Sequence, residues 1–241
     1  LQERGIKWRP GNKAEMMVSD EEDGFAALFT PERRPLCQLY LISPSAIGPD
    51  FADRLRSALE AAPVAAFQLR LKGVDDHAIA RAAEPLQKIC ADLDTAFIVN
   101  DSISLAKRLG ADGVHLGQHD GDPREARTIL GKDAQIGVTC HNSRHLAMEA
   151  GEAGADYVAF GAFHPTGTKD VEHFAEPEIL SWWSTLFPIP CVAIGGITPG
   201  NAAPLVAAGA DFIAASGAVW NAEGGEAAAV RAFSAILAGP A

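Results

Sequence analysis

The chain has 241 residues, of which 48% are hydrophobic, so it can bury a sizeable core and is not generally disordered. Its formal net charge of −11 repels phosphate-rich surfaces, which argues against nucleic acid or an anionic membrane as a partner. An anionic small-molecule substrate would need a local basic pocket. Because no window of 18 apolar residues occurs, no membrane-spanning helix is predicted.

Four cysteines are present, at positions 37, 90, 140 and 191. No pair has CxxC spacing and no histidine cluster accompanies them, which argues against a zinc site. Three of the four lie in apolar runs, as small buried hydrophobic residues do. The sequence therefore predicts reduced thiols and a cytoplasmic protein. It does not define the oligomeric state, and a homo-oligomer remains open.

Residues 1–35 differ from the rest, because they are polar, are interrupted by Pro10 and Gly11, and carry an acidic run at 20–23. We expect them to form an N-terminal extension, followed by one domain over residues 36–241.

From Gln38 onward, eight short apolar runs alternate with segments of helical pattern. The predicted strands are 38–42, 64–70, 96–99, 113–116, 135–138, 157–160, 191–194 and 212–215. The predicted helices include 51–61, 78–93, 102–109, 124–130, 144–153, 201–208 and 226–237. Eight such units favour an α/β fold of the (β/α)₈ TIM-barrel type. An open doubly wound sheet is the alternative, but no GxGxxG turn follows the first strand.

The tripeptide Gly-Ala-Asp precedes three of the predicted strands, at 110–112, 154–156 and 209–211. A glycine at this place suits a helix C-cap that turns tightly into the next strand. We expect these segments at the bottom of the barrel, with a structural role.

The active site of such a barrel lies at the carboxyl ends of its strands. Arg70 and Lys72 are two apart at one strand end, so they share a face, and Lys169 adds a third cation from another loop. Three cations in an acidic protein suit a diphosphate. Asp101 and Asp120 end adjacent strands and suit Mg²⁺, although either could instead cap the helix that follows it.

A second anion site is predicted after the last two strands, at Gly195–Gly196 and Ser216–Gly217. Barrels commonly hold a phosphomonoester there on backbone N–H groups, which glycine lets the phosphate approach. The alternative is that the glycine pair is only a tight turn. One diphosphate site and one monophosphate site together indicate a transferase that joins two phosphorylated fragments.

These residues occur in seven ordered motifs between 38 and about 220, and the set resembles the thiamine-phosphate synthase (pyrophosphorylase) family. The motifs are QLRLKG (68–73), ND (100–101), GADGVHLGQHD (110–120), IGVTCH (136–141), ADYVAFGAFHPTGTK (155–169), VAIGGITPGN (192–201) and the last Gly-Ala-Asp strand with its SG end. The resemblance implies an enzyme of thiamine biosynthesis. It would condense hydroxymethylpyrimidine diphosphate with thiazole phosphate, giving thiamine phosphate and diphosphate.

The resemblance also implies roles for individual residues. The pyrimidine diphosphate would contact Gln68, Arg70, Lys72, Asn100, Thr139 and Lys169. Mg²⁺ would bind Asp101 and Asp120. The thiazole phosphate would contact Thr166, Thr168, Gly196, Ser216 and Gly217. Diphosphate leaves first in this family and the aminopyrimidine stabilises the cation, so no catalytic nucleophile or strong base is expected.

Several positions depart from the family pattern. Gly217 stands where a serine is usual and is preceded by Ser216, while His119 replaces a glutamate. Leu71 replaces an acid, with a side chain expected to face away from the mouth, and Ala162 replaces a proline. Two alternatives therefore remain: a thiazole tautomerase-like paralogue that uses a histidine such as His141, and a non-catalytic relative that binds phosphorylated ligands.

Overall fold

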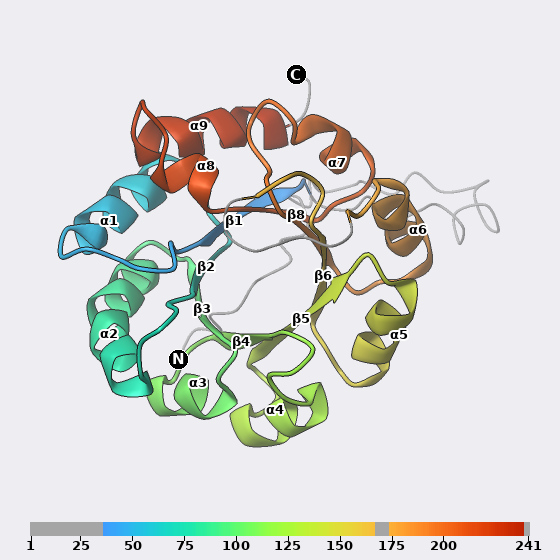
Figure 1. Cartoon of the computed structure of the whole chain (residues 1–241), viewed down its shortest axis with the longest axis horizontal. Coiled ribbons are helices and arrows are strands. Elements are labelled where there is room, and N and C mark those ends of the chain that lie inside the picture. The colour runs from blue at the N-terminus through green and yellow to red at the C-terminus, as the bar shows by residue number, and fades with distance from the viewer. Residues whose placement is uncertain (1–35, 167–173, 239–241) are drawn as a thin grey trace, which may run out of the picture.

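The computed structural model describes residues 36–166 and 174–238, which form a closed barrel of eight parallel strands (Figure 1). Each strand pairs with its neighbours in chain order, and β8 closes the ring by pairing with β1. The strands are β1 (Gln38–Ile42), β2 (Ala66–Leu69), β3 (Ala96–Asn100), β4 (Gly113–Leu116), β5 (Gln135–His141), β6 (Tyr157–Gly161), β7 (Cys191–Ile194) and β8 (Phe212–Ala215). The predicted (β/α)₈ barrel is confirmed.

Helices surround the barrel, and within the described residues one follows each strand, with α9 added after α8 (Figure 1). They are α1 (Phe51–Ala61), α2 (Asp76–Asp92), α3 (Ile103–Leu109), α4 (Pro123–Leu130), α5 (Arg144–Glu152), α6 (Glu178–Leu186), α7 (Ala203–Ala207), α8 (Gly217–Trp220) and α9 (Glu226–Leu237). The sequence pattern did not single out α6 or the four-residue α8. No helix in the described ranges is long and apolar enough to cross a membrane.

Polar residues with short side chains begin several of these helices. Ser102 and Ser143 accept hydrogen bonds from backbone N–H groups three residues later, at the starts of α3 and α5. Asp75 caps α2 in the same way, and Asp122 caps α4 by accepting from the N–H of Arg124, two residues later. Because these side chains satisfy N–H groups that have no partner inside the helix, they define where each helix starts.

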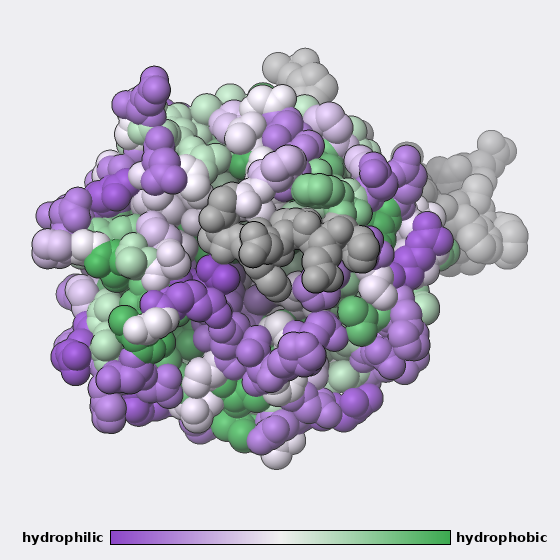
Figure 2. Space-filling model, viewed as in Figure 1, coloured by the Kyte–Doolittle hydropathy of each residue, from purple (hydrophilic) through white to green (hydrophobic). Residues whose placement is uncertain are grey.

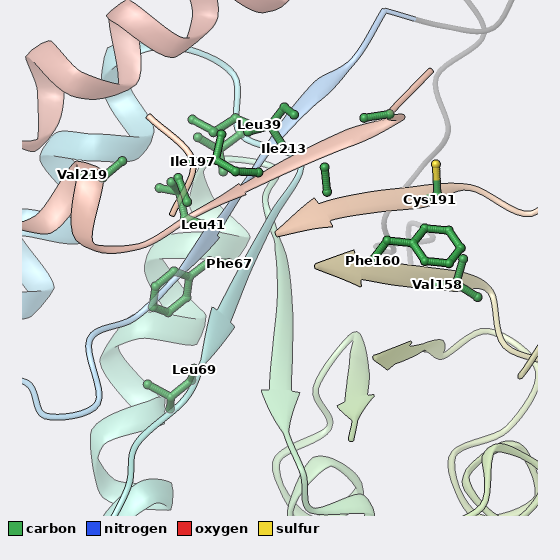
Figure 3. Packing of buried hydrophobic residues seen from close by; sticks show 14 of the residues in the cluster. Leu39, Leu41, Phe67, Leu69, Val158, Phe160, Cys191, Ile197, Ile213 and Val219 are labelled. Carbon is green, nitrogen blue, oxygen red and sulfur yellow. The ribbon is translucent and has the colours of Figure 1, made fainter. Parts of the chain in front are cut away.

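The strands separate two apolar layers. The layer inside the barrel includes Tyr40, Ile98, Tyr157 and Phe212. The larger layer between strands and helices is made by the alternate strand residues, such as Phe67 on β2 and Phe160 on β6, which Figure 3 shows among their neighbours. This alternation decides which side chains of each strand can reach the interior and the mouth of the barrel.

The three Gly-Ala-Asp segments have one shared structural role. Each glycine has a positive φ, of 59°, 87° and 97° at positions 110, 154 and 209. The aspartates that follow, Asp112, Asp156 and Asp211, each accept a hydrogen bond from the first or second backbone N–H of the preceding strand, at 2.7–2.8 Å. The predicted structural role at the amino ends of the strands therefore fits the geometry.

Several strand bounds differ from the prediction: β2 spans Ala66–Leu69 and not 64–70, and β6 extends to Gly161. Strand β5 continues to His141, with an irregular register between Thr139 and His141, so both residues lie within the strand rather than after it. Strand β3 includes Asn100. Polar side chains at these ends face the barrel mouth, where the sequence pattern cannot distinguish a strand end from a loop. Residues 1–35, predicted to be an N-terminal extension, lie outside the described part of the chain.

Candidate active site

Two amide side chains from neighbouring strands lie together at the mouth of the barrel. Gln68 on β2 is 2% exposed, and its Nε2 donates to Oδ1 of Asn100 on β3 at 2.7 Å. Buried amides need such partners, because an unpaired polar group in the interior is costly. The bond fixes both amide planes, so the Gln68 carbonyl oxygen and the Asn100 amino group keep defined directions.

An ion pair lies next to this amide pair. The ammonium nitrogen of Lys72 is 2.7 Å from Oδ2 of Asp101. Asp101 has a φ of 67°, in the left-handed region that side chains other than glycine seldom adopt. It does not cap α3, because Ser102 does. The alternative capping role for Asp101 is therefore wrong, and this strained backbone is typical of functional sites.

The second predicted metal ligand lies against the first. Burial raises the pKa of Asp120, and hydrogen bonding to Asp101 and its negative charge raise it further. Oδ2 of Asp120 accepts from the backbone N–H of Gly117 at 2.9 Å. The capping role is wrong here too, because Asp122 caps α4. Two contacting carboxylates repel one another, and a divalent cation between them would remove that repulsion.

Arg70 directly follows Leu69, the last residue of β2. Its backbone N–H donates to Oγ of Ser43, a fully buried residue directly after the neighbouring β1. The charge of Arg70 is close enough to His115 on β4 to lower the pKa of that imidazole. The structure thus brings Gln68, Arg70, Lys72, Asn100, Asp101 and Asp120 to one side of the mouth. Figure 2 shows hydrophilic residues around the centre of one barrel face.

The predicted substrate contact Thr139 is half-buried and belongs to a polar chain inside the barrel. Its Oγ1 lies 2.8 Å from Nε2 of His115, and His115 Nδ1 lies 3.1 Å from the Tyr157 hydroxyl. The Tyr157 hydroxyl is 3.0 Å from that of Tyr40. Burial lowers the pKa of His115 to about 4, with Asp101 opposing and Arg70 adding to this shift, so the imidazole is neutral at pH 7.

Sequence reasoning did not single out His115, Tyr157 or Tyr40. The runs that contain them read as apolar strands, and two of the three side chains are aromatic rings that a core accepts. A polar residue at an inward position of a buried strand was the available signal, because buried polar atoms require partners.

The predicted monophosphate site follows β7 and β8. Gly196 has a φ of 63°, and a side chain there would collide with the carbonyl oxygens of Pro165 and His164. Thus the glycine pair is a tight turn held against the loop after β6. Oγ of Ser216 donates to the carbonyl oxygen of Ser43 at 3.3 Å, which directs this hydroxyl to the protein. Gly217 begins α8.

The loop after β6 is described only in part. Thr166 is half-buried, whereas Thr168 and Lys169 lie outside the described residues. The predicted convergence of Lys169 with Arg70 and Lys72 therefore stays a prediction.

Comparison with known proteins identifies the family of the chain. A sequence model of the family described as "Thiamine monophosphate synthase" matches residues 39–219. This chain belongs to that family. A protein of Erythrobacter litoralis called thiamine-phosphate synthase is 65% identical over 83% of this chain and 95% of its own. A protein of the same name from Rhodospirillum centenum is 57% identical, over 84% and 99%.

A solved structure of a family member supports the fold. The thiamine phosphate pyrophosphorylase of Pyrococcus furiosus is 31% identical and superposes with a TM-score of 0.74, over 83% of this chain and 95% of its own. The match to the family spans residues 39–219, which include every candidate site residue and all of the barrel strands except Gln38 of β1.

The positions that depart from the family pattern have different surroundings. Leu71 packs against the outer apolar layer, so its side chain faces away from the mouth as expected. His119 is exposed. Ala162 lies against Gly195, whose φ of 100° and close neighbours leave no space for a side chain. His141 is exposed at the end of β5 and has a φ of 52°.

Proposed function

We propose that the strand ends described above bind hydroxymethylpyrimidine diphosphate beside thiazole phosphate and join them. Thiamine-phosphate synthase activity in thiamine biosynthesis is the function of the chain, given its family and its relatives at 57% and 65% identity. One observation carries the assignment of the site. The Lys72–Asp101 ion pair, the contacting Asp120 and the Gln68–Asn100 amide pair lie together at the mouth.

The pyrimidine diphosphate is assigned to this side of the mouth. Arg70 and Lys72 supply positive charge for the diphosphate, and Lys169 is the third cation proposed from the sequence. Arginine suits this role because its planar fork of N–H donors matches phosphate oxygens. The directed amide groups of Gln68 and Asn100 offer one acceptor and one donor to the substrate, and Thr139 offers a hydroxyl from β5.

Mg²⁺ is the proposed metal, with Asp101 and Asp120 as its protein ligands. Among the described residues, no cluster of three or more His, Cys, Asp or Glu side chains could hold a metal ion. A site with two carboxylates suits Mg²⁺, which completes its coordination with water and substrate phosphate oxygens. When bound, the metal would neutralise charge on the diphosphate as it leaves.

The thiazole phosphate is assigned to the opposite side of the mouth. Its phosphate would meet the N–H groups of Gly196, Ser216 and Gly217, together with Thr166 and Thr168 from the loop after β6. Backbone donors are favoured because the Ser216 hydroxyl already donates to the Ser43 carbonyl. The glycine at 196 allows the tight turn against the carbonyl oxygens of Pro165 and His164, which sets the position of its own backbone N–H.

The reaction exchanges one bond for another. The C–O bond between the pyrimidine methylene and diphosphate breaks, and its electron pair leaves with the diphosphate. The lone pair of the thiazole nitrogen then forms a C–N bond to that carbon, giving a thiazolium product. The protein holds the leaving group, aligns the acceptor and excludes water, so it needs no nucleophile of its own.

Incubating the purified chain with both substrates and Mg²⁺ tests this proposal. We expect equal amounts of thiamine phosphate and diphosphate, measured by chromatography, only when both substrates are present. Isomerisation of thiazole carboxylate phosphate without diphosphate release would instead support the tautomerase-like alternative. Binding of both ligands without any turnover would support a non-catalytic relative.

We also propose a division of the chain into domains, a cellular location and an oligomeric state. Residues 1–35 are assigned to an extension and residues 36–241 to the barrel domain, so deletion of 1–30 should leave the melting temperature unchanged. A cytoplasmic location is supported by four free, buried cysteines. A homo-oligomer is compatible with this fold, and sedimentation of the purified chain measures its size.

A further inference from the structure

A chain of four hydrogen-bonding side chains crosses the barrel from β1 to β5. It runs through the Tyr40 and Tyr157 hydroxyls, the His115 imidazole and the Thr139 hydroxyl, with contacts of 3.0, 3.1 and 2.8 Å. The first three residues are buried, with exposures of 2%, 1% and 7%, and Thr139 alone is half-buried. The chain therefore starts in the barrel interior and ends at the mouth.

The surrounding residues hold this chain in place. The rings of His115 and Tyr157 stack, with centroids 5.6 Å apart and planes inclined by 28°. Position 137 on β5 is glycine, and any side chain there would collide with the ring and hydroxyl of Tyr157. The strand thus lacks a side chain at the point where Tyr157 enters, two residues before Thr139.

The number of available hydrogens determines which of these side chains donates and which accepts at each contact. A neutral imidazole carries one N–H, and each hydroxyl carries one hydrogen. If Nδ1 of His115 held the hydrogen, Tyr157 would donate to Tyr40, and the buried Tyr40 hydrogen would lack an acceptor among the described residues. In the reverse direction Tyr40 donates to Tyr157, Tyr157 donates to Nδ1, and Nε2–H donates to Thr139. Only this arrangement uses every buried hydrogen, as interiors require.

In this arrangement the hydroxyl hydrogen of Thr139 has no acceptor among the four side chains. Thr139 is also the member of the four that lies at the mouth of the barrel. Because Oγ1 already accepts from His115, the threonine hydroxyl acts outward as a donor. We propose that His115 is a positioning residue, which fixes the Thr139 hydroxyl as a hydrogen-bond donor to an acceptor atom of the bound pyrimidine diphosphate. This inference rests on the proposed function, in which Thr139 contacts that substrate.

The acceptor is either a ring nitrogen or a diphosphate oxygen, and both have the same hydrogen-bonding chemistry. Inhibition by hydroxymethylpyrimidine and by inorganic diphosphate, measured separately on the parent and on Thr139→Val, distinguishes them. The inhibitor whose affinity falls in Thr139→Val is the one that carries the acceptor.

Two substitutions at position 115 separate positioning from packing. Gln places an amide nitrogen near the Nε2 position, whereas Asn reaches only the Nδ1 position and leaves Thr139 without a donor. We expect His115→Asn to raise KM for the pyrimidine diphosphate about fivefold to tenfold, which corresponds to about 1.0–1.4 kcal/mol. KM for thiazole phosphate should stay within about twofold, and His115→Gln should recover most of the loss.

Controls exclude a general effect of instability. Thr95→Val also removes a buried hydroxyl, one that donates to the Val64 carbonyl at 3.2 Å at the amino end of β3, so it should lower the melting temperature but not change KM. In a Thr139→Val background, His115→Asn should have no further effect on KM, because a positioning residue acts only through its partner.

The tautomer of His115 gives a readout that does not depend on turnover. In ¹⁵N-histidine-labelled protein, with the signal assigned by its loss in His115→Gln, we expect the hydrogen on Nε2. A hydrogen on Nδ1, or an unchanged KM in His115→Asn while Thr139→Val raises it, overturns the inference alone. An unchanged KM in Thr139→Val overturns the proposed substrate contact as well.

Discussion

The ammonium nitrogen of Lys72 lies 2.7 Å from Oδ2 of Asp101, so one predicted phosphate ligand is paired with one predicted metal ligand. Their side chains are 49% and 35% exposed, and an ion pair this exposed contributes only about 0–1 kcal/mol. Replacing this ion pair by other partners therefore costs little free energy. Mg²⁺ bound by Asp101 would release Lys72 toward the diphosphate, which links binding of the metal to binding of the substrate.

The first prediction concerns the metal. Asp101→Asn removes the charge that a hard cation favours, while asparagine still tolerates the φ of 67° at this position. We expect the Mg²⁺ concentration for half-maximal activity to rise by at least about tenfold, measured by titration with Mg²⁺. Asp122→Asn is the matched control, because asparagine is an equally good cap for α4. Full activity of the parent enzyme after complete chelation would contradict the metal assignment.

The second prediction concerns Arg70. Arg70→Gln keeps a polar side chain but removes the positive charge from the mouth. A hydrogen bond to a charged group contributes about 1.5–3 kcal/mol, so KM for the pyrimidine diphosphate should rise by about 10- to 150-fold. Arg81→Gln on the exposed face of α2 should leave this constant unchanged. An equal effect of both variants would assign the loss to net charge, not to the site.

Sequence patterns predicted the barrel because its strands are short, buried and apolar. Strands β1, β4, β7 and β8 were predicted with their observed bounds, and so were α1 and α9. The helix α8 was missed because four residues give no helical periodicity. The helix α6 was also missed, and it begins at Glu178, beyond residue 169 where the motif read after β6 ends.

The sequence proposed members of the candidate site but held no information on the contacts among them. The strand ends identified Asp101 and Asp120, but their capping alternatives could be rejected only when Ser102 and Asp122 proved to be the caps. The chain from Tyr40 to Thr139 joins four strands, and their contacts depend on the curvature and stagger of the closed barrel. Spacing along a single strand holds no information on this geometry.

The third prediction concerns stability at the opposite end of the barrel. Oδ2 of Asp211 accepts the backbone N–H of Cys191 at 2.8 Å, and Asp211 is 8% exposed. Asp211→Ala removes the carboxylate that accepts from this buried N–H, so the free energy of unfolding should fall by about 1–3 kcal/mol, measured in urea. The exposed Asp133→Ala should change it by less than about 0.5 kcal/mol. The KM values of both variants should equal those of the parent. A higher KM in Asp211→Ala would show that a disturbance at the amino ends of the strands is transmitted to the mouth of the barrel.

The fourth prediction concerns the glycine turn after β7. A side chain at position 196 would collide with Pro165 and His164, and the φ of 63° is unfavourable for alanine. Gly196→Ala should therefore displace the loop and raise KM for thiazole phosphate by at least about tenfold, corresponding to about 1.4 kcal/mol. Gly200→Ala is the matched control, since the nearest atom to its added carbon is 3.8 Å away. Equal kinetics in the two variants would remove Gly196 from the phosphate site.

The last prediction concerns Gly217, which stands where the family pattern has serine. A side chain added there meets only Asn221 Nδ2, at an ordinary distance of 3.6 Å, so serine fits without displacing its neighbours. One added hydrogen bond to a charged phosphate contributes about 1.5–3 kcal/mol, and Gly217→Ser should thus lower KM for thiazole phosphate by about 10- to 150-fold. Gly217→Ala adds the same carbon without the hydroxyl and should show no such gain. Steady-state kinetics with the acceptor varied at saturating pyrimidine diphosphate measure both. If serine and alanine behave alike, the hydroxyl does not reach the phosphate, and the acceptor binds on backbone N–H groups at some distance from position 217.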